Sequence, residues 1–130
     1  MRKVLLDTNF LLIPGQFKVD IFSEIDRLID SEYRIVVAEP SLKELERILK
    51  EGGGKDKAAA KLGLALIKSK GVEILGQPQK VFKGVDDFLL ETAVQNNFIV
   101  GTADRELRKR LKQAGIPVIV LRSKQHLVLE

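Results

Sequence analysis

The sequence predicts an α/β fold, a three-layer α/β/α sandwich with a mostly parallel sheet of about five strands. Short, continuously apolar runs recur along the chain, as in strands that are buried on both faces. Longer amphipathic stretches separate these runs, which is typical of helical crossovers between parallel strands. The chain has 130 residues, of which 45% are hydrophobic and 31% charged. This composition fits one ordinary globular domain, and we expect it to cover residues 1–130.

Five apolar runs are the predicted strands. They cover residues 4–6, 35–38, 72–75, 98–101 and 118–121. The third run is the weakest, because Glu73 interrupts its apolar character. None of the runs approaches the roughly 20 residues that a membrane span requires, so no membrane partner is expected.

Amphipathic patterns between the runs predict the helices. We expect helices around residues 18–31, 42–51, 58–69, 86–96 and 107–114. Ser41 is expected to cap the second of these, with Glu44 as its capping-box partner. The glycines at 52–54 are expected to end that helix, and Gly115 to end the last one.

Carboxylates follow two of the predicted strands and open two of the predicted helices. Asp7 follows the first strand and Asp104 comes three residues after the fourth. Glu44 lies in the first turn of one helix, and Asp86 and Asp87 open another. In an open parallel sheet, functional groups gather outside the carboxyl ends of the strands. We therefore expect these acids to converge at one edge of the sheet.

A cluster of carboxylates favours a divalent cation. Like charges repel one another, and burial intensifies the repulsion. The sequence has no cysteine and one histidine, so oxygen ligands and hence Mg²⁺ or Mn²⁺ are the realistic metal chemistry. Such an ion can activate water and neutralise charge on a phosphodiester. The pattern predicts metal-dependent phosphodiester hydrolysis with water as the nucleophile.

Each acid also has a purely structural interpretation. Asp104, and either Asp86 or Asp87, can cap the helix that follows it. Asp7 can form an Asx turn, and Glu44 can be only a member of a capping box. Spacing alone leaves these alternatives open.

Four segments of the chain resemble the PIN domain, a small α/β nuclease fold. They are LLDTN at residues 5–9, LKEL at 42–45, DDFLLETA at 86–93 and VGTADREL at 100–107. The resemblance implies a ribonuclease that holds one or two Mg²⁺ or Mn²⁺ ions and cleaves single-stranded RNA. It implies catalytic and metal-binding roles for Asp7, Glu44, Asp86 and Asp104. The absence of cysteine makes a cytoplasmic location the default expectation.

The same resemblance suggests supporting roles for other polar residues. Thr8, Asn9 and Thr102 would support the metal ligands or orient the substrate. Asp87 competes with Asp86 for the third acidic position, and Glu91 is an optional additional acid.

Two subgroups of the family fit the chain. VapC-type toxins are PIN ribonucleases that a protein antitoxin neutralises. Archaeal relatives of the small-subunit rRNA-processing PIN nuclease would act on pre-ribosomal RNA, and the Asp86-Asp87 doublet and residues 104–111 and 115–118 favour them. PIN-like proteins commonly dimerise, so the Ala- and Leu-rich stretch at 58–69 is a candidate homodimer surface.

A stripe of basic residues is predicted beside the acids. Arg105, Arg108, Lys109 and Lys112 follow the i, i+3, i+4, i+7 spacing of one helix face. The stripe can track an RNA backbone, and the alternative is a solvated helix face. The net charge of +4 permits an anionic partner without requiring one. Aromatic residues are only 5% of the chain, and core packing is the expected role for most of them.

Two other function classes compete with the nuclease. A haloacid-dehalogenase-like phosphatase needs a second Asp two residues after the first, and Asn9 occupies that position. A catalytically silent PIN-like module would bind RNA or protein without cutting. The presence of all four principal acids argues against it.

Overall fold

A six-stranded sheet forms the middle layer of the protein in the computed structural model, which describes residues 1–76 and 84–130. The strands are β1 (Arg2–Leu6), β2 (Tyr33–Ala38), β3 (Glu73–Leu75), β4 (Ile99–Gly101), β5 (Val118–Arg122) and β6 (His126–Leu129). Their order across the sheet is β3-β2-β1-β4-β5-β6. All neighbours are parallel except β5 and β6, which are antiparallel. The predicted α/β fold with a mostly parallel sheet is therefore confirmed.

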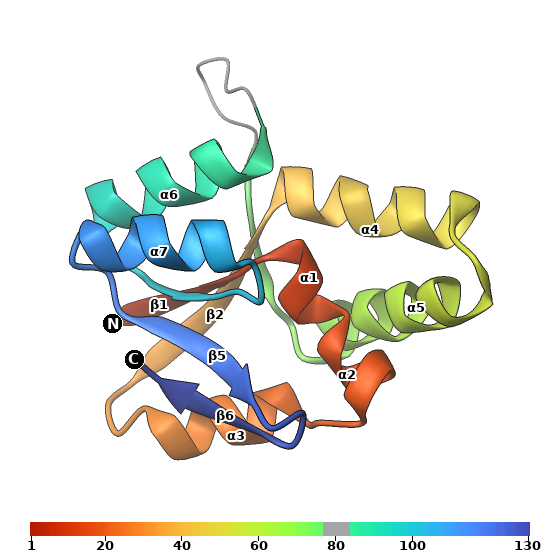
Figure 1. The fold of residues 1–130 in the computed structure, drawn as a ribbon, viewed down its shortest axis with the longest axis horizontal. Helices are drawn as coiled ribbons and strands as arrows, with labels where there is room; N and C mark the ends of the chain where they lie inside the picture. The colour runs from red at the N-terminus through yellow and green to blue at the C-terminus, as the bar shows by residue number, and fades with distance from the viewer. Residues whose placement is uncertain (77–83) are drawn as a thin grey trace.

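Helices cover both faces of this sheet (Figure 1). They are α1 (Thr8–Leu11), α2 (Ile13–Phe17), α3 (Ile21–Leu28), α4 (Glu39–Glu51), α5 (Gly54–Ser69), α6 (Val85–Asn96) and α7 (Arg105–Gln113). Figure 1 shows α6 and α7 side by side on one face, and their packing is a direct helix–helix contact. No helix in the described parts of the chain is long and apolar enough to cross a membrane.

Alternation along the strands divides the apolar residues between two cores. In β1, Val4 and Leu6 join the core that α1 to α5 cover, whereas Leu5 joins the core beneath α6 and α7. All three side chains are fully buried. Strands buried on both faces read as continuous apolar runs, which is why the sequence reveals them without alternation.

The helix expected around residues 18–31 is shorter in the structure. Lys18 ends α2 in a left-handed conformation (φ 57°), and α3 begins only at Ile21. Asp20 caps α3 by accepting a hydrogen bond from the Ser23 backbone N–H at 3.1 Å. Two short helices, α1 and α2, occupy the segment between Asp7 and Lys18, where no helix was predicted.

The predicted N-cap of α4 at Ser41 is wrong. The helix begins at Glu39, with Pro40 in its first turn and Ala38 as an N-cap that makes no side-chain hydrogen bond. Proline fits the first turn because its φ is already helical and its missing N–H would have no partner there. Ser41 is instead fully buried, and its Oγ has no hydrogen-bond partner in the described structure. The predicted end of the helix at Gly52 is confirmed.

The antiparallel edge strand β6 was not predicted. Its outer edge is closed by α3 rather than by another strand. The Leu127 backbone N–H donates to Glu24 Oε1 at 2.9 Å, and Arg27 Nη2 donates to the Leu127 carbonyl at 2.9 Å. Two side chains thus replace the missing neighbour of the strand, and local sequence pattern does not reveal such a pairing.

Candidate active site

Parallel pairing brings Asp7 and Thr102 to the same edge of the sheet. Leu6, the last residue of β1, lies opposite Gly101, the last residue of β4. The Asp7 backbone N–H donates to the Gly101 carbonyl at 2.9 Å. The residues that follow these two strands are therefore held beside each other at the carboxyl edge, where the sequence predicted a site.

Asp7 is a buried acid with two hydrogen-bond donors on its carboxylate. The exposed fraction of the whole residue is 4%. Oδ1 accepts a hydrogen bond from the Thr8 backbone N–H at 2.7 Å, and Oδ2 accepts one from Thr102 Oγ1 at 2.8 Å. The Thr102 hydroxyl in turn accepts from the Asp104 backbone N–H at 3.1 Å. One hydroxyl therefore joins the carboxylate of Asp7 to the backbone that carries Asp104.

Burial raises the pKa of Asp7 to about 6. The hydrogen bonds from Thr102 and Thr8 oppose this change, whereas the negative charges of Asp86 and Asp104 add to it. A carboxylate normally ionises well below this pH, so the site holds a negative charge at a cost. A nearby cation would remove that cost.

Asp86 lies in the same electrostatic environment. Its pKa is raised by burial, then by the charge of Asp104 and by a hydrogen bond with the Asp104 side chain. The positive charge of Arg110 lowers the pKa of Asp86 and so acts in the opposite direction. The structure thus brings Asp7, Asp86 and Asp104 together from three separate segments of the chain.

Two of these acids also cap helices. Asp104 is the N-cap of α7 and accepts from the Leu107 backbone N–H at 3.0 Å. Asp7 is the N-cap of α1. The capping interpretation of Asp104 is therefore correct, whereas Asp7 caps α1 and was expected to form an Asx turn. Both caps are compatible with a functional role, because a carboxylate has two oxygens and several lone pairs. Asp86 and Asp87 lie inside the first turn of α6, whose N-cap is Gly84.

The side chains of Asp87 and Glu91 form hydrogen bonds with residues other than Asp7, Asp86 and Asp104. Arg110 Nη2 donates to Asp87 Oδ1 at 2.8 Å, linking α7 to the start of α6. Glu91 accepts a hydrogen bond from Gln95 Nε2, one turn further along α6, at 3.1 Å. Arg110 was not singled out in the sequence, because it lies outside the i, i+3, i+4, i+7 stripe. Only the packing of α7 on α6 shows its place beside the acids.

Glu44 lies on α4, which packs against α1. Its carboxylate forms an ion pair with Arg47, three residues along the same helix, at 3.5 Å. Its side chain is 39% exposed, in contrast to the buried Asp7. The ion pair therefore runs along α4 and does not join Glu44 to the three aspartates.

The neighbours of Asp7 in the sequence fasten the loop after β4. Asn9 Oδ1 accepts a hydrogen bond from the Ala103 backbone N–H at 3.0 Å. Thr8 is buried, and its Oγ1 has no hydrogen-bond partner within residues 1–76 and 84–130. Asn9 thus holds α1 to the segment that carries Asp104.

The donor set suits a hard cation that needs few protein ligands. Within the described ranges, no group of three or more Asp, Glu or His side chains is arranged closely enough to hold a metal ion as a ready-made cage. Mg²⁺ does not require such a cage, because it retains several waters and is bound through one or two carboxylates together with substrate phosphates. Asp7 and Asp86, whose pKa values are raised by burial and by neighbouring negative charge, are oxygen donors that fit such an ion.

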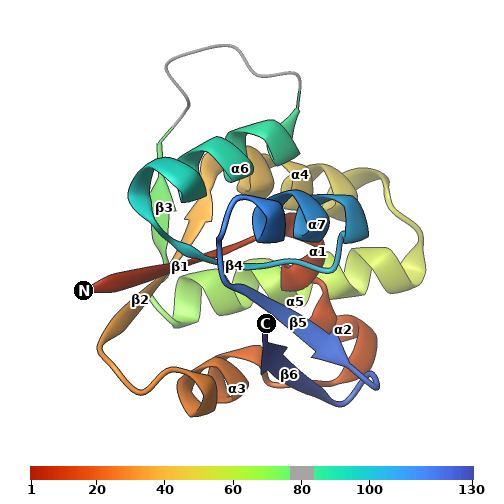
Figure 2. The ribbon, with the colours of Figure 1, turned by 60° about the vertical axis from the view of Figure 1, so that its left-hand side comes forward.

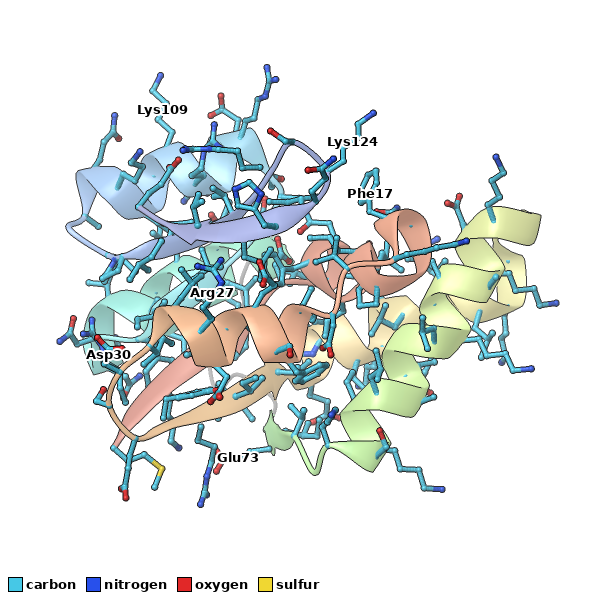
Figure 3. The ribbon with its side chains drawn as sticks, turned by 90° about the horizontal axis from the view of Figure 1, so that it is seen from below. Phe17, Arg27, Asp30, Glu73, Lys109 and Lys124 are labelled. Carbon is cyan, nitrogen blue, oxygen red and sulfur yellow. The ribbon has the colours of Figure 1, made fainter. Side chains whose placement is uncertain are left out.

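The predicted basic stripe lies along α7, directly after Asp104. Arg105, Arg108, Lys109 and Lys112 line a surface cavity of about 560 Å³ together with Glu106 and Gln113. Lys109 extends from α7 into solvent (Figure 3). Lys112 Nζ pairs with Glu130 Oε1 at 3.0 Å, and this ion pair lowers the pKa of Glu130, as do the charges of Arg108 and Arg122. Part of the stripe is thus neutralised by the protein itself.

Two relatives that are named ribonucleases are similar to this chain along almost its whole length. The first is Ribonuclease VapC4 of Methanocaldococcus jannaschii, with 35% identity over 97% of this chain and 95% of the relative. The second is Ribonuclease VapC9 of Archaeoglobus fulgidus, with 29% identity over 100% of this chain and 90% of the relative.

Solved structures show the same fold. The PIN domain endonuclease Utp24 matches with a TM-score of 0.77 and 23% identity, over 98% of this chain and 90% of Utp24. A domain of a functionally unknown protein from Methanocaldococcus jannaschii matches with a TM-score of 0.61 and 20% identity, over 95% of this chain and 93% of that domain. At these identities the likeness concerns the fold.

A family model described as a PIN-like domain matches residues 4–124. The match includes every strand-end and helix-start acid of the site. The chain therefore belongs to the PIN-like domain family.

Proposed function

We propose that the protein is a ribonuclease that requires Mg²⁺ or Mn²⁺ and cleaves single-stranded RNA with water as the nucleophile. The observation that carries the proposal is the buried carboxylate of Asp7, whose pKa is raised to about 6 at a point where Asp86 and Asp104 add further negative charge. Such an arrangement is unfavourable on its own and favourable around a cation. RNA as the substrate is inferred from the two relatives that are named ribonucleases.

Asp7, Asp86 and Asp104 would hold the metal, with Glu44 joining them directly or through water. When bound, the ion would supply positive charge for the phosphodiester and make a water molecule more acidic. Asp104 can serve while it caps α7, because the cap uses Oδ1. Asp86 is preferred to Asp87, because Arg110 already engages the carboxylate of Asp87.

The remaining residues of the site hold these acids in place. Thr102 orients the Asp7 carboxylate by donating to Oδ2 while it accepts from the Asp104 backbone. Asn9 fixes the loop at Ala103, and Thr8 begins α1 beside the acid. Glu91 is proposed as an accessory acid one turn along α6. The basic stripe on α7 would guide the RNA backbone toward Asp104.

Cleavage of a labelled single-stranded RNA tests the proposal. We expect cleavage with Mg²⁺ or Mn²⁺, none with EDTA, and none with the Asp7→Asn variant. Asp20→Asn is the matched control, because it makes the same chemical change at the exposed N-cap of α3 and Asn caps a helix about as well as Asp. Full metal-dependent activity in Asp7→Asn would contradict the assignment. RNA binding without cleavage in any metal would favour a silent binding module.

The names of the two relatives favour a VapC-type ribonuclease over an rRNA-processing enzyme, since the likeness to Utp24 is one of fold. A protein antitoxin is then the partner to test. Self-association is proposed through α5, where Leu62 is 40% exposed. Sedimentation that finds only monomer at high concentration would contradict the homodimer.

A further inference from the structure

An exposed aromatic ring with a lysine over it lies between α2 and the loop that joins β5 to β6. Phe17, the last residue of α2, is 36% exposed, although most of the phenylalanines were expected to pack in the core. Lys124 Nζ lies 6.0 Å from the centre of the Phe17 ring, and Figure 3 shows the two side chains together. Lys18 follows Phe17 directly and is exposed. We call Phe17, Lys18 and Lys124 the Phe17 patch.

The patch lies beyond the carboxyl ends of the strands, as Asp7 does. β5 runs parallel to β4, with Ile119 opposite Gly101, and it continues for three more residues to Arg122. The loop after Arg122 therefore reaches roughly 10 Å beyond the strand ends, at about 3.3 Å per residue. Figures 1 and 2 both show this hairpin tip beside α2. Two short helices, α1 and α2, join Asp7 to Phe17, and ten helical residues span about 15 Å, so Phe17 lies within roughly that distance of Asp7.

The backbone of the patch is unusual. Four non-glycine residues of the described chain have a positive φ, and three of them are Lys18 (57°), Ser123 (57°) and Lys124 (55°). This left-handed conformation suits glycine or asparagine better than lysine. Lys18 adopts it as the C-cap of α2, and Ser123 and Lys124 adopt it in the turn of the β5–β6 hairpin, where the chain commonly takes this conformation. The chain accepts the strain at two positions where the residue is a lysine.

We propose that the Phe17 patch binds single-stranded RNA, with a base stacked on Phe17 and the flanking phosphates contacted by Lys18 and Lys124. Aromatic faces combined with cations are the usual means of binding a single strand without reading its sequence. A base can replace Lys124 over the ring, because the cation–π contact is the one interaction of its ammonium group with the described part of the chain. The proposal deepens the proposed ribonuclease function and rests on it: the patch and the α7 stripe would contact the strand on two sides of the acids.

The test measures binding to a labelled single-stranded RNA by fluorescence anisotropy in EDTA, so that no cleavage intervenes. Phe17→Leu should weaken binding by at least about 5-fold, and Phe17→Tyr should retain it, because both aromatic rings stack. An abasic oligomer of equal charge should bind wild type and Phe17→Leu alike. This second probe separates lost stacking from misfolding, which would weaken both ligands.

Lysine variants test the charge. Lys124→Gln should reduce the slope of log K against log salt by about 0.7, the value for one phosphate contact on a single strand. Lys70→Gln is the matched control. Lys70 also lies over a phenylalanine, at 5.7 Å from the ring of Phe22, but it precedes β3 at the opposite edge of the sheet. We expect Lys70→Gln to leave the slope unchanged.

Wild-type affinity in Phe17→Leu, or an equal loss in Lys70→Gln, would overturn the proposal. A Phe17 or Lys124 variant that alters only the sedimentation of the protein would also overturn the proposal, because the patch would then be a contact between proteins. Parallel cleavage assays separate this inference from the proposed function. Metal-dependent cutting that is indifferent to Phe17 would overturn only the patch, and binding that depends on Phe17 without any cutting would overturn only the nuclease.

Discussion

At the scale of the residue, Asp7 is the group whose environment most needs explanation. A fully ionised carboxylate is rarely buried unless it is paired, and Asp7 is buried beside two further acids. Among the described residues, the carboxylate is stabilised by two hydrogen bonds, from Thr8 and Thr102, and by no ion pair. The fold therefore maintains a costly group, as proteins do at sites that act on a ligand.

The raised pKa of Asp7 predicts how stability depends on pH in the absence of metal. The folded state holds the proton up to about pH 6, whereas the unfolded chain releases it near 3.8. The folded state therefore binds more protons between these values, and this group makes stability fall as the pH rises through that window. Above about pH 6 the cost is complete.

Asp7→Asn should remove that cost. We expect the metal-free variant to be more stable than wild type by about 1–3 kcal/mol at pH 7, and by less at pH 4. Urea unfolding in EDTA at the two pH values measures the difference. The Asp20→Asn control should show no such change. Equal or lower stability of Asp7→Asn at pH 7 would contradict the account.

Thr102 is predicted to act as a positioning residue. Thr102→Val keeps the shape of the buried side chain but removes the donor to Asp7 and the acceptor for the Asp104 backbone. We expect a loss of about 10- to 100-fold in Mg²⁺ affinity or activity, as for other groups that orient metal ligands. Thr102→Ser should restore most of it. An unchanged Mg²⁺ titration in Thr102→Val would show that the hydroxyl is only structural.

At the scale of the element, the packing of α7 on α6 distinguishes two adjacent acids. Asp86 interacts with Asp104, whereas Asp87 pairs with Arg110. We expect Asp86→Asn to abolish cleavage and Asp87→Asn to retain most of it. The Asp87 ion pair is partly exposed, so its loss should cost less than about 1 kcal/mol of stability. Cleavage assays and thermal melts of both variants check this, and the reverse ranking would exchange the roles of the two acids.

The contact between α3 and β6 makes a prediction about stability alone. Glu24→Ala leaves the buried Leu127 backbone N–H without its acceptor. We expect a loss of about 1–2 kcal/mol in unfolding free energy, with cleavage retained in the folded protein. Glu46→Ala, at an exposed position on α4, is a suitable control for surface substitution. Stability equal to that of the control would mean that water replaces Glu24 at the strand edge.

At the scale of the whole molecule, the amino and carboxyl ends of the parallel strands differ in how their charges are arranged. At the amino end of the strands, Glu73 pairs with both Lys3 and Arg34, at 2.8 and 3.2 Å. At the carboxyl end, the negative charges of Asp86 and Asp104 raise the pKa of Asp7, and the charge of Asp104 raises the pKa of Asp86. Among the main influences on the pKa of Asp86, the one opposite charge is that of Arg110. The acid at the amino end is thus paired with basic residues, whereas the acids at the carboxyl end carry excess negative charge that a cation would balance.

Metal binding should therefore stabilise the entire fold. A ligand present at 100 times its Kd raises the unfolding free energy by about 2.7 kcal/mol. We expect Mg²⁺ to raise the melting temperature of wild type and of Asp20→Asn, and to have little effect on Asp7→Asn. Melts across a Mg²⁺ titration provide the measurement. Identical shifts in wild type and Asp7→Asn would place the ion elsewhere.

Local patterns predicted most elements correctly, and their failures have physical causes. The continuous apolar runs identified the five parallel strands, because both faces of each strand are buried. They missed β6, since its outer edge is completed by Glu24 and Arg27, which lie 103 and 100 residues away from Leu127 in the chain. The pattern at Ser41 resembled a capping box, but the helix had already begun at Glu39, with Pro40 in its first turn.

The sequence by itself determined the layered α/β architecture and the placement of acids at strand ends and helix starts, because hydrophobic periodicity and turn signals act over short distances. Only the tertiary structure decided which acids meet. The register of β1 against β4 sets Asp7 beside Thr102, and the packing of α6 and α7 assigns Asp104 to Asp86 and Arg110 to Asp87. It also placed Lys124 over Phe17. Such pairings depend on distances between segments remote in the chain, and these exist only once the sheet has formed.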